Sequence, residues 1–417
     1  MTPRALLCLA AGHAALACSA EAPTSSSAPV SPPPVTSHVD AFDVPIAGLE
    51  HDFLADFNDG DLLFSTPLRE SDGLGPLYTR AACSSCHEGA VRGPGLVQKM
   101  SIVDADGVTP ADDQSALKFG HTLHPLTAGG GKTPILPPAD EPAVKVTTRF
   151  GPPVLGRGYL EAVSDQEIER VEAEQSTRDD GIQGRINWVT YASEANVDTR
   201  FHRYQKGDRV IGRFGLKARV AALDDFTADA FQGDMGITSP LRPTEFENPD
   251  DLSDDAKPGI DVGFDSVNLR ALYVRLLAIP RRAADDAGAA LFEAALCSVC
   301  HVPTLHTRAD YPVPGLADVD APVYTDLLLH RMSDDLADGL PADPTVDGDA
   351  DSFSWRTAPL IGLRFDRTYL HDGRAKTIAD AISLHRGAGS EANPAIAAFD
   401  ALDADDQQSL VTFVAGL

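Results

Sequence analysis

The motif Cys-x-x-Cys-His occurs twice in this chain, as CSSCH at residues 83–87 and as CSVCH at residues 297–301. A redox-active cysteine pair requires only the cysteines, and a zinc site gives no reason for a histidine at the same position after both pairs. Covalent c-type haem explains all three residues, because the thiols add to the haem vinyl groups and the histidine binds the iron. The sequence therefore predicts two covalently attached c-type haems, around which the chain has to fold. The predicted attachment residues are Cys83, Cys86, His87, Cys297, Cys300 and His301.

Acidic residues outnumber basic ones, with 62 Asp and Glu against 34 Lys and Arg and a net charge of −28. Such a surface repels nucleic-acid phosphates and anionic lipid heads, so we expect no nucleic-acid partner. A redox partner protein or a small electron donor is easier to bring close. The 417 residues, of which 43% are hydrophobic, suggest two or three domains and a sizeable buried core.

The N-terminus resembles an export signal followed by a tether. Arg4 precedes an apolar run, residues 5–17, that is too short to span a bilayer. The run ends in AALAC, which resembles the lipobox of bacterial lipoproteins and would place a lipid anchor on Cys18, although Ala15 stands where Leu is usual. An ordinary signal peptide cut nearby is the alternative. We predict a signal peptide at residues 1–18, a Pro/Ser/Ala-rich tether at residues 19–45, and a periplasmic or outer-membrane-anchored protein.

Short stretches around the two motifs repeat in the same order. GDLLF at residues 60–64 precedes the first motif and GAALF at residues 288–292 precedes the second. RFGPPVLG, which begins at residue 149, similarly resembles RTAPLIGL, which begins at residue 356. Their common order suggests two haem domains of one ancestry. We predict an N-terminal c-type haem domain with loop insertions at residues 46–282 and a C-terminal cytochrome c-like haem domain at residues 283–417.

Helical periodicity predicts a mainly α fold with long irregular loops wrapped around the haems. Pro and Gly are abundant between the periodic segments, and only short strands are expected, for example from Val144 to Thr148. Helices are expected at residues 159–173, 221–233, 267–278, 286–296, 376–385 and 404–416.

Several longer stretches resemble bacterial di-haem oxidoreductases related to the di-haem cytochrome c peroxidases, a group once described as thiol oxidoreductases. The stretches include GLGPLYTRAACSSCH, QGDMGITSP, CSVCHVPTL and WRTAPLIGLRFDRTYLHDGRAKTIADAISLH, and the resemblance runs from about Phe57 to Leu417. It implies that one haem is the reactive centre and that the other is six-coordinate and relays electrons. The resemblance therefore predicts a peroxidase-like haem oxidoreductase, with electrons passing from the C-terminal haem to a reactive N-terminal haem that meets peroxide or another small oxidant.

The resemblance places the acid–base residue of the peroxidases at Asp234, before Met235 and Gly236. A carboxylate there takes a proton from bound peroxide and returns it to the leaving oxygen. The relatives have Glu, and the shorter Asp side chain reaches less far. The alternative is that Asp234 is a helix-end residue, and Met235 either packs or binds iron as a soft ligand. The Trp that lies between the haems of the relatives corresponds to Phe214 here, and the chain has two tryptophans elsewhere, Trp188 and Trp355.

The resemblance points to His385 as the upper iron ligand of the second haem, opposite His301. Ligation by two histidines suits electron storage or relay. The alternative is that His385 is a surface residue near a helix C-terminus, and His371 is expected to hydrogen-bond near this haem. The first haem is either open on its upper side or closed by one of four downstream residues: Met100, His121, His124 or His202.

Two further patterns bear on binding. The acidic DGDAD stretch at residues 347–351 lacks the Gly and Glu that a calcium loop of the EF type requires, so it indicates an exposed loop. Arg356 and Arg374 are expected to pair with haem propionates, since guanidinium groups suit carboxylates.

The sequence allows two functions besides a peroxidase-like enzyme. The first is an electron-transfer cytochrome without substrate turnover, serving respiration or iron acquisition, which Asp234 and Phe214 favour. The second is a thiol–disulfide oxidoreductase, which would leave the four motif cysteines as reactive thiols.

Overall fold

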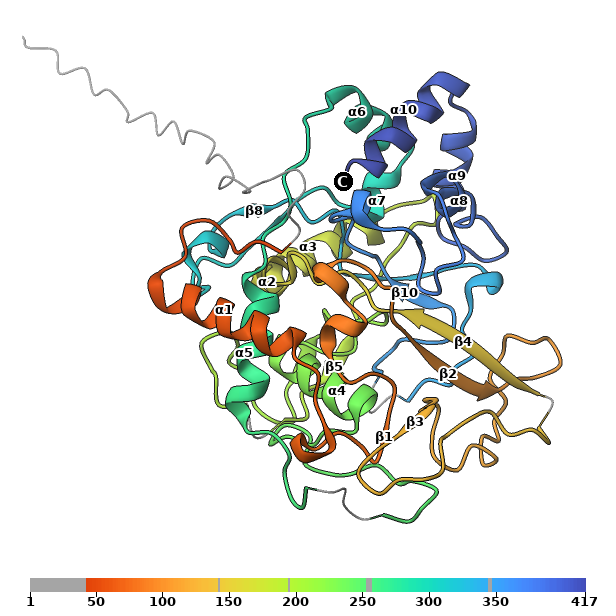
Figure 1. Cartoon of the computed structure of the whole chain (residues 1–417). Helices are drawn as coiled ribbons and strands as arrows, with labels where there is room; N and C mark the ends of the chain where they lie inside the picture. Colours follow the sequence, from red (N-terminus) through yellow and green to blue (C-terminus); the bar gives the residue numbers. More distant parts are fainter. Residues whose placement is uncertain (1–42, 142, 194–195, 253–256, 344–346) are drawn as a thin grey trace, which may run out of the picture. The chain divides into compact units, whose positions relative to one another are not determined.

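The helices of the described chain form two groups around the two Cys-x-x-Cys-His motifs (Figure 1). The computed structural model describes residues 43–417 apart from 142, 194–195, 253–256 and 344–346, all within one compact unit. The predicted signal peptide, Cys18 and all but the last three residues of the tether lie outside the described residues. The first group contains α1 (His51–Ser65), α2 (Arg157–Ala162), α4 (Leu223–Met235) and α5 (Phe264–Leu276). The second contains α6 (Asp286–Ala294), α7 (Cys297–Cys300), α8 (Ile378–Ser383), α9 (Asn393–Asp400) and α10 (Ala404–Ala415), while α3 (Asp165–Ser176) follows α2 in the chain.

The strands pair as antiparallel two-stranded ribbons in the described residues. The longest ribbon joins β2 (Leu96–Ile102) to β4 (Val144–Phe150), with Leu96 opposite Phe150. A shorter one joins β9 (Leu329–Arg331) to β10 (Ser354–Arg356). The other ribbons are β1 (Leu77–Tyr78) with β3 (Leu126–Thr127), β5 (Trp188–Thr190) with β6 (Arg209–Ile211), and β7 (Leu305–His306) with β8 (Asp320–Ala321). Short 3-10 helices occur at Glu70–Asp72, Cys83–Ser85, Glu88–Ala90, Pro314–Leu316, Asp334–Leu336 and Leu363–Phe365.

The prediction of a mainly α fold is wrong, because helices account for only 32% of the structure and strands for 14%. The chain contains 31 Pro and 34 Gly, which interrupt helices. Segments such as VKVTTRF in β4 are rich in β-branched residues, which favour strands. The pairing partner of β4 lies more than forty residues earlier in the chain, so local periodicity did not reveal the ribbon.

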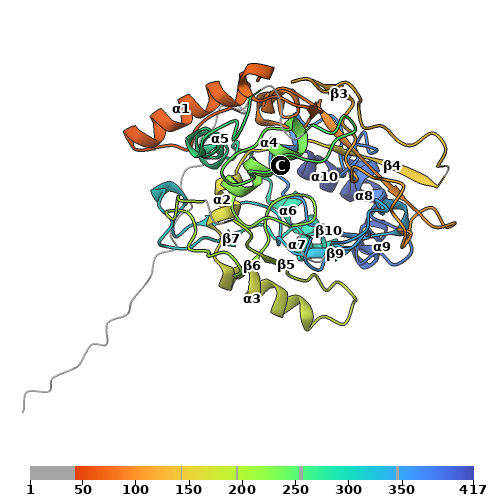
Figure 2. The same ribbon diagram turned by 90° about the horizontal axis from the view of Figure 1, so that it is seen from below.

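Most of the predicted helices are present, with shifted ends. The helix expected at residues 159–173 is broken into α2 and α3 at Ser164, whose side chain caps α3 by accepting a hydrogen bond from the Glu167 backbone N–H. The helix α9 was not predicted. In Figures 1 and 2, α8, α9 and α10 stay together on one side of the described unit, away from α1.

The repeated Gly and Phe before each motif have equivalent structural roles. Gly60 lets α1 pack closely on α5, because a Cβ at this position would lie 2.3 Å from the Leu269 carbonyl oxygen. Gly288 does the same for α6 against α10, where a Cβ would lie 2.5 Å from the Phe413 Cβ. Both Phe64 and Phe292 are buried. Each motif is therefore preceded by a helix that is pressed onto another helix through a glycine.

The hydrophobic core consists of several clusters, of which the largest joins both predicted haem domains and another, smaller one lies near the C-terminus. The large cluster extends from Ile46 to Ile361 and includes residues from both predicted haem domains. The smaller cluster includes Phe292, Tyr324 and Phe413 and lies between α6 and α10. The predicted boundary between residues 282 and 283 stays a prediction.

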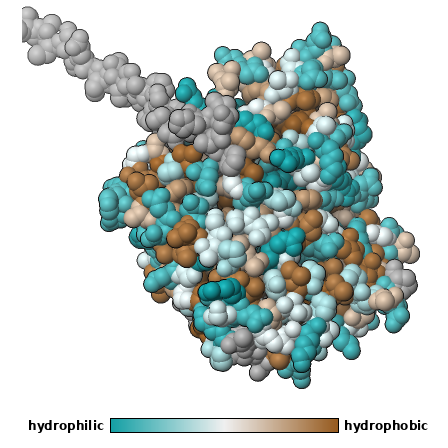
Figure 3. Space-filling model, viewed as in Figure 1, coloured by the Kyte–Doolittle hydropathy of each residue, from teal (hydrophilic) through white to brown (hydrophobic). Residues whose placement is uncertain are grey.

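Hydrophilic and apolar residues are mixed over the face shown in Figure 3. No described helix is long and apolar enough to cross a membrane.

Candidate haem sites

The first motif presents His87 with one ring nitrogen already fixed. The Nδ1 atom of His87 donates to the Pro152 carbonyl oxygen over 2.7 Å. Burial lowers the pKa of His87 to about 4, so the imidazole is neutral at physiological pH and Nε2 keeps its lone pair. A metal-binding histidine has this arrangement, in which a backbone carbonyl fixes the tautomer and the ring orientation. His87 is therefore suited to bind iron through Nε2.

A cavity of about 870 Å³ adjoins the first motif, and Cys83, Cys86 and His87 all line it. Neither cysteine pair of the chain forms a disulfide in the described structure. The cavity brings together the two thiols and the imidazole that a c-type haem uses, next to enough space for a bound group. The residues present at this site therefore fit a haem.

Asp234 lies in the last turn of α4 and lines the same cavity as His87. Burial raises the pKa of Asp234 to about 6, while Lys99 opposes that rise and Asp229 adds to it. A carboxyl group with this pKa can both accept and return a proton near neutral pH. Met235, the next residue, is 4% exposed and packs with Phe231 and Ile237 in an apolar cluster.

The structure places the four candidates for an upper ligand of the first haem very differently. Of these four residues, His121 alone lines the large cavity, and its Nδ1 bonds to the Met100 carbonyl oxygen over 2.9 Å. Met100, a residue of β2, is 3% exposed and packs in an apolar cluster with Leu117 and Leu123. His124 bonds through Nε2 to the Gly233 carbonyl oxygen, and His202 stacks on Tyr204. The geometry therefore leaves His121 as the candidate with access to the cavity.

At the second motif, the imidazole rings of His301 and His385 lie close to each other. Their ring centroids lie 6.4 Å apart, and the ring planes are inclined by 60°. Two imidazoles on opposite sides of one metal ion, with metal–nitrogen bonds of about 2 Å, have centroids roughly 6 Å apart. The observed separation therefore fits a single iron atom between the rings.

Both rings of this pair are fixed in the same way as His87. The Nδ1 of His301 bonds to the Tyr324 carbonyl oxygen over 3.2 Å, and that of His385 bonds to the Ala381 carbonyl oxygen over 2.7 Å. Burial lowers the pKa of both, to about 4 for His301. No hydrogen bond involves either Nε2 atom within the described part of the chain, so both are available to a metal.

A buried cluster that the sequence did not indicate supports the second motif. His330 lies between two carboxylates, with Nε2 2.8 Å from Asp326 and Nδ1 2.8 Å from Glu391. Against the opposing effect of burial, Cys300 and Asp326 raise the pKa of His330 well above its usual range. Gln175 of α3 donates to Asp326 over 2.9 Å and to the Val299 carbonyl oxygen over 2.8 Å. The cluster therefore ties α3 to the backbone of α7.

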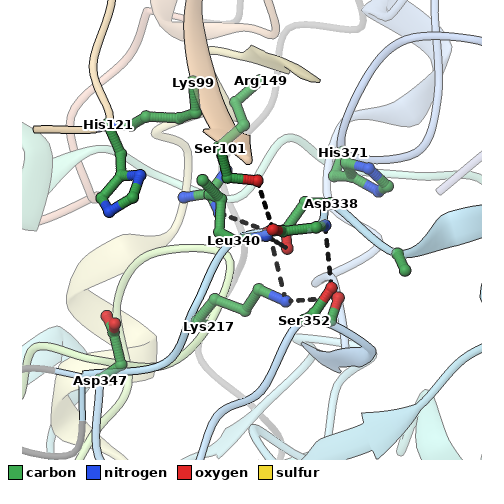
Figure 4. A network of polar contacts seen from close by, with 12 residues as sticks. Lys99, Ser101, His121, Arg149, Lys217, Asp338, Leu340, Asp347, Ser352 and His371 are labelled. Atoms are coloured by element: carbon green, nitrogen blue, oxygen red, sulfur yellow. Dashed lines mark hydrogen bonds and ion pairs between the residues drawn. The ribbon is translucent and has the colours of Figure 1, made fainter. Parts of the chain in front are cut away.

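A second polar network lies beside the large cavity (Figure 4). Asp338 forms ion pairs with Arg149 over 2.6 Å and with Lys217 over 3.5 Å. The Lys217 ammonium also donates to the Asp351 and Ser354 carbonyl oxygens over 2.8 Å. The network joins β4 to the segment that precedes β10. Here too the sequence carried no signal, because the partners are separated by more than a hundred residues.

The tryptophans have contrasting surroundings. Trp355 stacks on His371, with centroids 3.8 Å apart, and the Lys217 ammonium lies 3.7 Å from its ring. Trp355 is also opposite His330 in the β9–β10 ribbon. Trp188 instead lies in β5, with the Arg209 guanidinium 5.1 Å from its ring centroid. Phe214 lines the large cavity and stacks on Phe226.

A protein-family profile described as "Di-haem oxidoreductase, putative peroxidase" matches residues 139–417. The matched range includes the second motif, and the first motif precedes it. Among solved structures, hydrazine synthase of Kuenenia stuttgartiensis, pressurised with xenon, is 15% identical, with a TM-score of 0.39 over 100% of both chains. No curated protein matches the chain.

Proposed function

Since the chain belongs to the di-haem oxidoreductase family, we propose that it is an exported, peroxidase-like oxidoreductase with two covalently attached c-type haems. The observation that carries the proposal is the asymmetry between its two sites. His301 and His385 face each other across 6.4 Å, whereas His87 faces a cavity that also contains a carboxyl group. The first arrangement suits electron relay and the second suits a reaction with a small oxidant.

The chain's own residues would divide the work between the two sites. When bound, each haem supplies an iron atom that gains or loses one electron. His87 would hold one iron, and His301 together with His385 would hold the other. Electrons from a redox partner protein or a small donor would enter at the His301 side. Asp234 would accept a proton from a peroxide in the cavity and return it to the departing oxygen atom.

The alternative is an electron-transfer cytochrome without substrate turnover, in respiration or iron acquisition. His121 supports it, since this side chain lines the cavity and has its Nδ1 bonded to a backbone carbonyl, as in the three predicted ligands. If His121 binds the first iron, the upper side of that site is closed.

The location of the protein is a further part of the proposal. Export to the periplasm, with or without a lipid anchor on Cys18, agrees with c-type haem attachment, which takes place outside the cytoplasm. The support comes from the N-terminal sequence alone.

Purified full-length protein tests the proposal in two steps. Absorption and paramagnetic-resonance spectra count the haems and report whether each iron is high-spin or low-spin. We expect two haems, and consumption of hydrogen peroxide with a reduced cytochrome as the donor. Turnover no faster than that of free haem, in protein carrying both haems, would contradict the peroxidase activity. Two low-spin haems that stay low-spin after one-electron reduction would favour the cytochrome.

A further inference from the structure

Several arginines in the wall of the large cavity form no ion pair within the described residues, and Arg157 and Arg356 are two of them. Arg157 and Arg356 both line the cavity beside His87 and are 7% and 8% exposed. Arg157 donates to the Pro153 carbonyl oxygen, and Arg356 donates to the carbonyl oxygens of Gly215 and Thr357 over 3.0 and 3.1 Å. Within the described residues, neither guanidinium forms an ion pair.

Two other arginines of the same cavity do form an ion pair. Arg149 pairs with Asp338, and Arg219 pairs with Asp229. The Nη1 atom of Arg157 is buried without any hydrogen-bond partner in the described structure, and so is the Nε atom of Arg149. An unpaired donor of this kind usually marks a missing ligand, water or ion.

The two guanidiniums also repel each other. Burial and the charge of Arg356 lower the pKa of Arg157 to about 9, and the Asp366 carboxylate only partly opposes this. Burial lowers the pKa of Arg356 to about 10, partly opposed by Asp326. Both groups remain cationic at neutral pH, so two positive charges stay close together in a site shielded from water. Such an arrangement is costly unless an anion compensates the charges.

The chemistry of guanidinium identifies the kind of anion. Its planar fork of N–H donors matches a carboxylate better than an ammonium group does. Arg157 follows the loop that holds His87, and Arg356 ends β10, so two distant segments supply the pair. The group that the cavity is proposed to hold carries two carboxylates, the haem propionates.

We propose that Arg157 and Arg356 bind the propionate groups of the haem held by Cys83, Cys86 and His87. This inference rests on the proposed function, because it requires a haem in the large cavity. The sequence alone predicts that Arg356 and Arg374 bind the propionates. The inference keeps Arg356 and replaces Arg374 by Arg157. The Arg374 guanidinium instead bonds to Asp372 over 2.5 Å and to the Asp335 carbonyl oxygen over 2.7 Å. Arg374 therefore already has an acidic partner.

Resonance Raman spectra of the full-length, haem-loaded protein test the inference without measuring activity. The bending band of the propionates responds to hydrogen bonds on the carboxylates. We expect this band to shift for one of the two haems in Arg157→Leu and in Arg356→Leu. The matched control is Arg374→Leu, which should leave the band unchanged.

A redox titration of the same variants provides the second readout. Loss of a cation beside the haem favours the ferric form, so its ferric–ferrous equilibrium should move about tenfold toward ferric, or about 59 mV for one electron. Arg157→Lys and Arg356→Lys keep the charge. They should shift the Raman band but move the equilibrium much less, and they replace the Leu variants if those do not fold.

Each result decides between the possibilities. If both haems are present and neither the band nor the equilibrium changes in any Arg157 or Arg356 variant, the inference is wrong and the proposed function is unaffected. If the wild-type protein carries no haem in the large cavity, both are wrong. If the equilibrium moves while the band stays constant in every variant, the arginines act only as nearby charges and the proposed contact is refuted.

Discussion

The His301 site and the His87 site use the same attachment motif but differ in what lies opposite the motif histidine. A second imidazole faces His301 at 6.4 Å, and both rings are fixed by backbone carbonyls. His87 is fixed in the same way, but it borders a cavity of about 870 Å³ that also contains Asp234, Lys99 and His121. The comparison teaches that two identical motifs can have different surroundings: the motif fixes only its own cysteines and histidine, whereas distant segments decide whether a second imidazole or a cavity lies opposite that histidine.

The largest expected effect comes from removing the facing imidazole. His385→Ala should abolish the low-spin signal of one haem completely, because the iron loses its second strong ligand. Paramagnetic resonance of the ferric protein measures this. His371→Ala is the matched control, since His371 stacks on Trp355 and is not expected to bind iron. A low-spin signal that survives in His385→Ala would refute the ligand assignment.

The next effect concerns the carboxyl group of the other site. Asp234→Asn should slow peroxide consumption by about 100-fold, the usual scale for loss of a proton-transfer group, and should leave both haem spectra nearly unchanged. Asp225→Asn serves as the control, because Asp225 lines the same cavity but accepts a hydrogen bond from the Tyr191 hydroxyl over 2.9 Å. If Asp234→Asn alters the low-spin haem instead, the roles of the two sites are exchanged.

The pH dependence of peroxide consumption tests whether Asp234 is the group that accepts the proton. Asp234 must be ionised to accept a proton, and burial raises its pKa to about 6. The rate should therefore rise with pH through about 6 and level off above it, and it should be about tenfold lower at pH 5 than on the plateau. This rise should disappear in Asp234→Asn. A wild-type profile that is flat between pH 5 and pH 8 would contradict the assignment.

The smallest effect tests whether the helix before each motif packs closely on its neighbour through a glycine. Gly60→Ala and Gly288→Ala should each lower the free energy of unfolding by about 1–3 kcal/mol, because the added Cβ overlaps the helix packed against it. The loss should be larger for Gly60, where the clash is with backbone. Gly233→Ala in α4 is the control, since no atom lies within 4 Å of its Cβ position. Thermal unfolding measures all three, and a Gly60→Ala or Gly288→Ala variant that is as stable as Gly233→Ala would show that this glycine is not a close helix contact.

Local chemistry made part of this protein predictable. The two motifs, the helices α4, α5, α6, α8 and α10, and the strand at Val144 could be read from spacing and periodicity. The error about the fold class arose where strands pair over long separations, as β2 does with β4. Periodicity describes one segment at a time, and a ribbon depends on a partner elsewhere in the chain.

The sequence by itself predicted covalent haem attachment at two motifs and proposed His385 and Asp234, because a short motif or a family resemblance carries such information. Only the tertiary structure placed His385 opposite His301. It also put Asp234 and His121 in one cavity with His87. The other three candidate ligands, His124, His202 and Met100, do not line that cavity. The tertiary structure also brought together Arg157 and Arg356, which lie almost two hundred residues apart. Charged groups and metal ligands interact over a few ångströms in space. The number of residues between two groups in the sequence does not tell how far apart they lie in the folded chain.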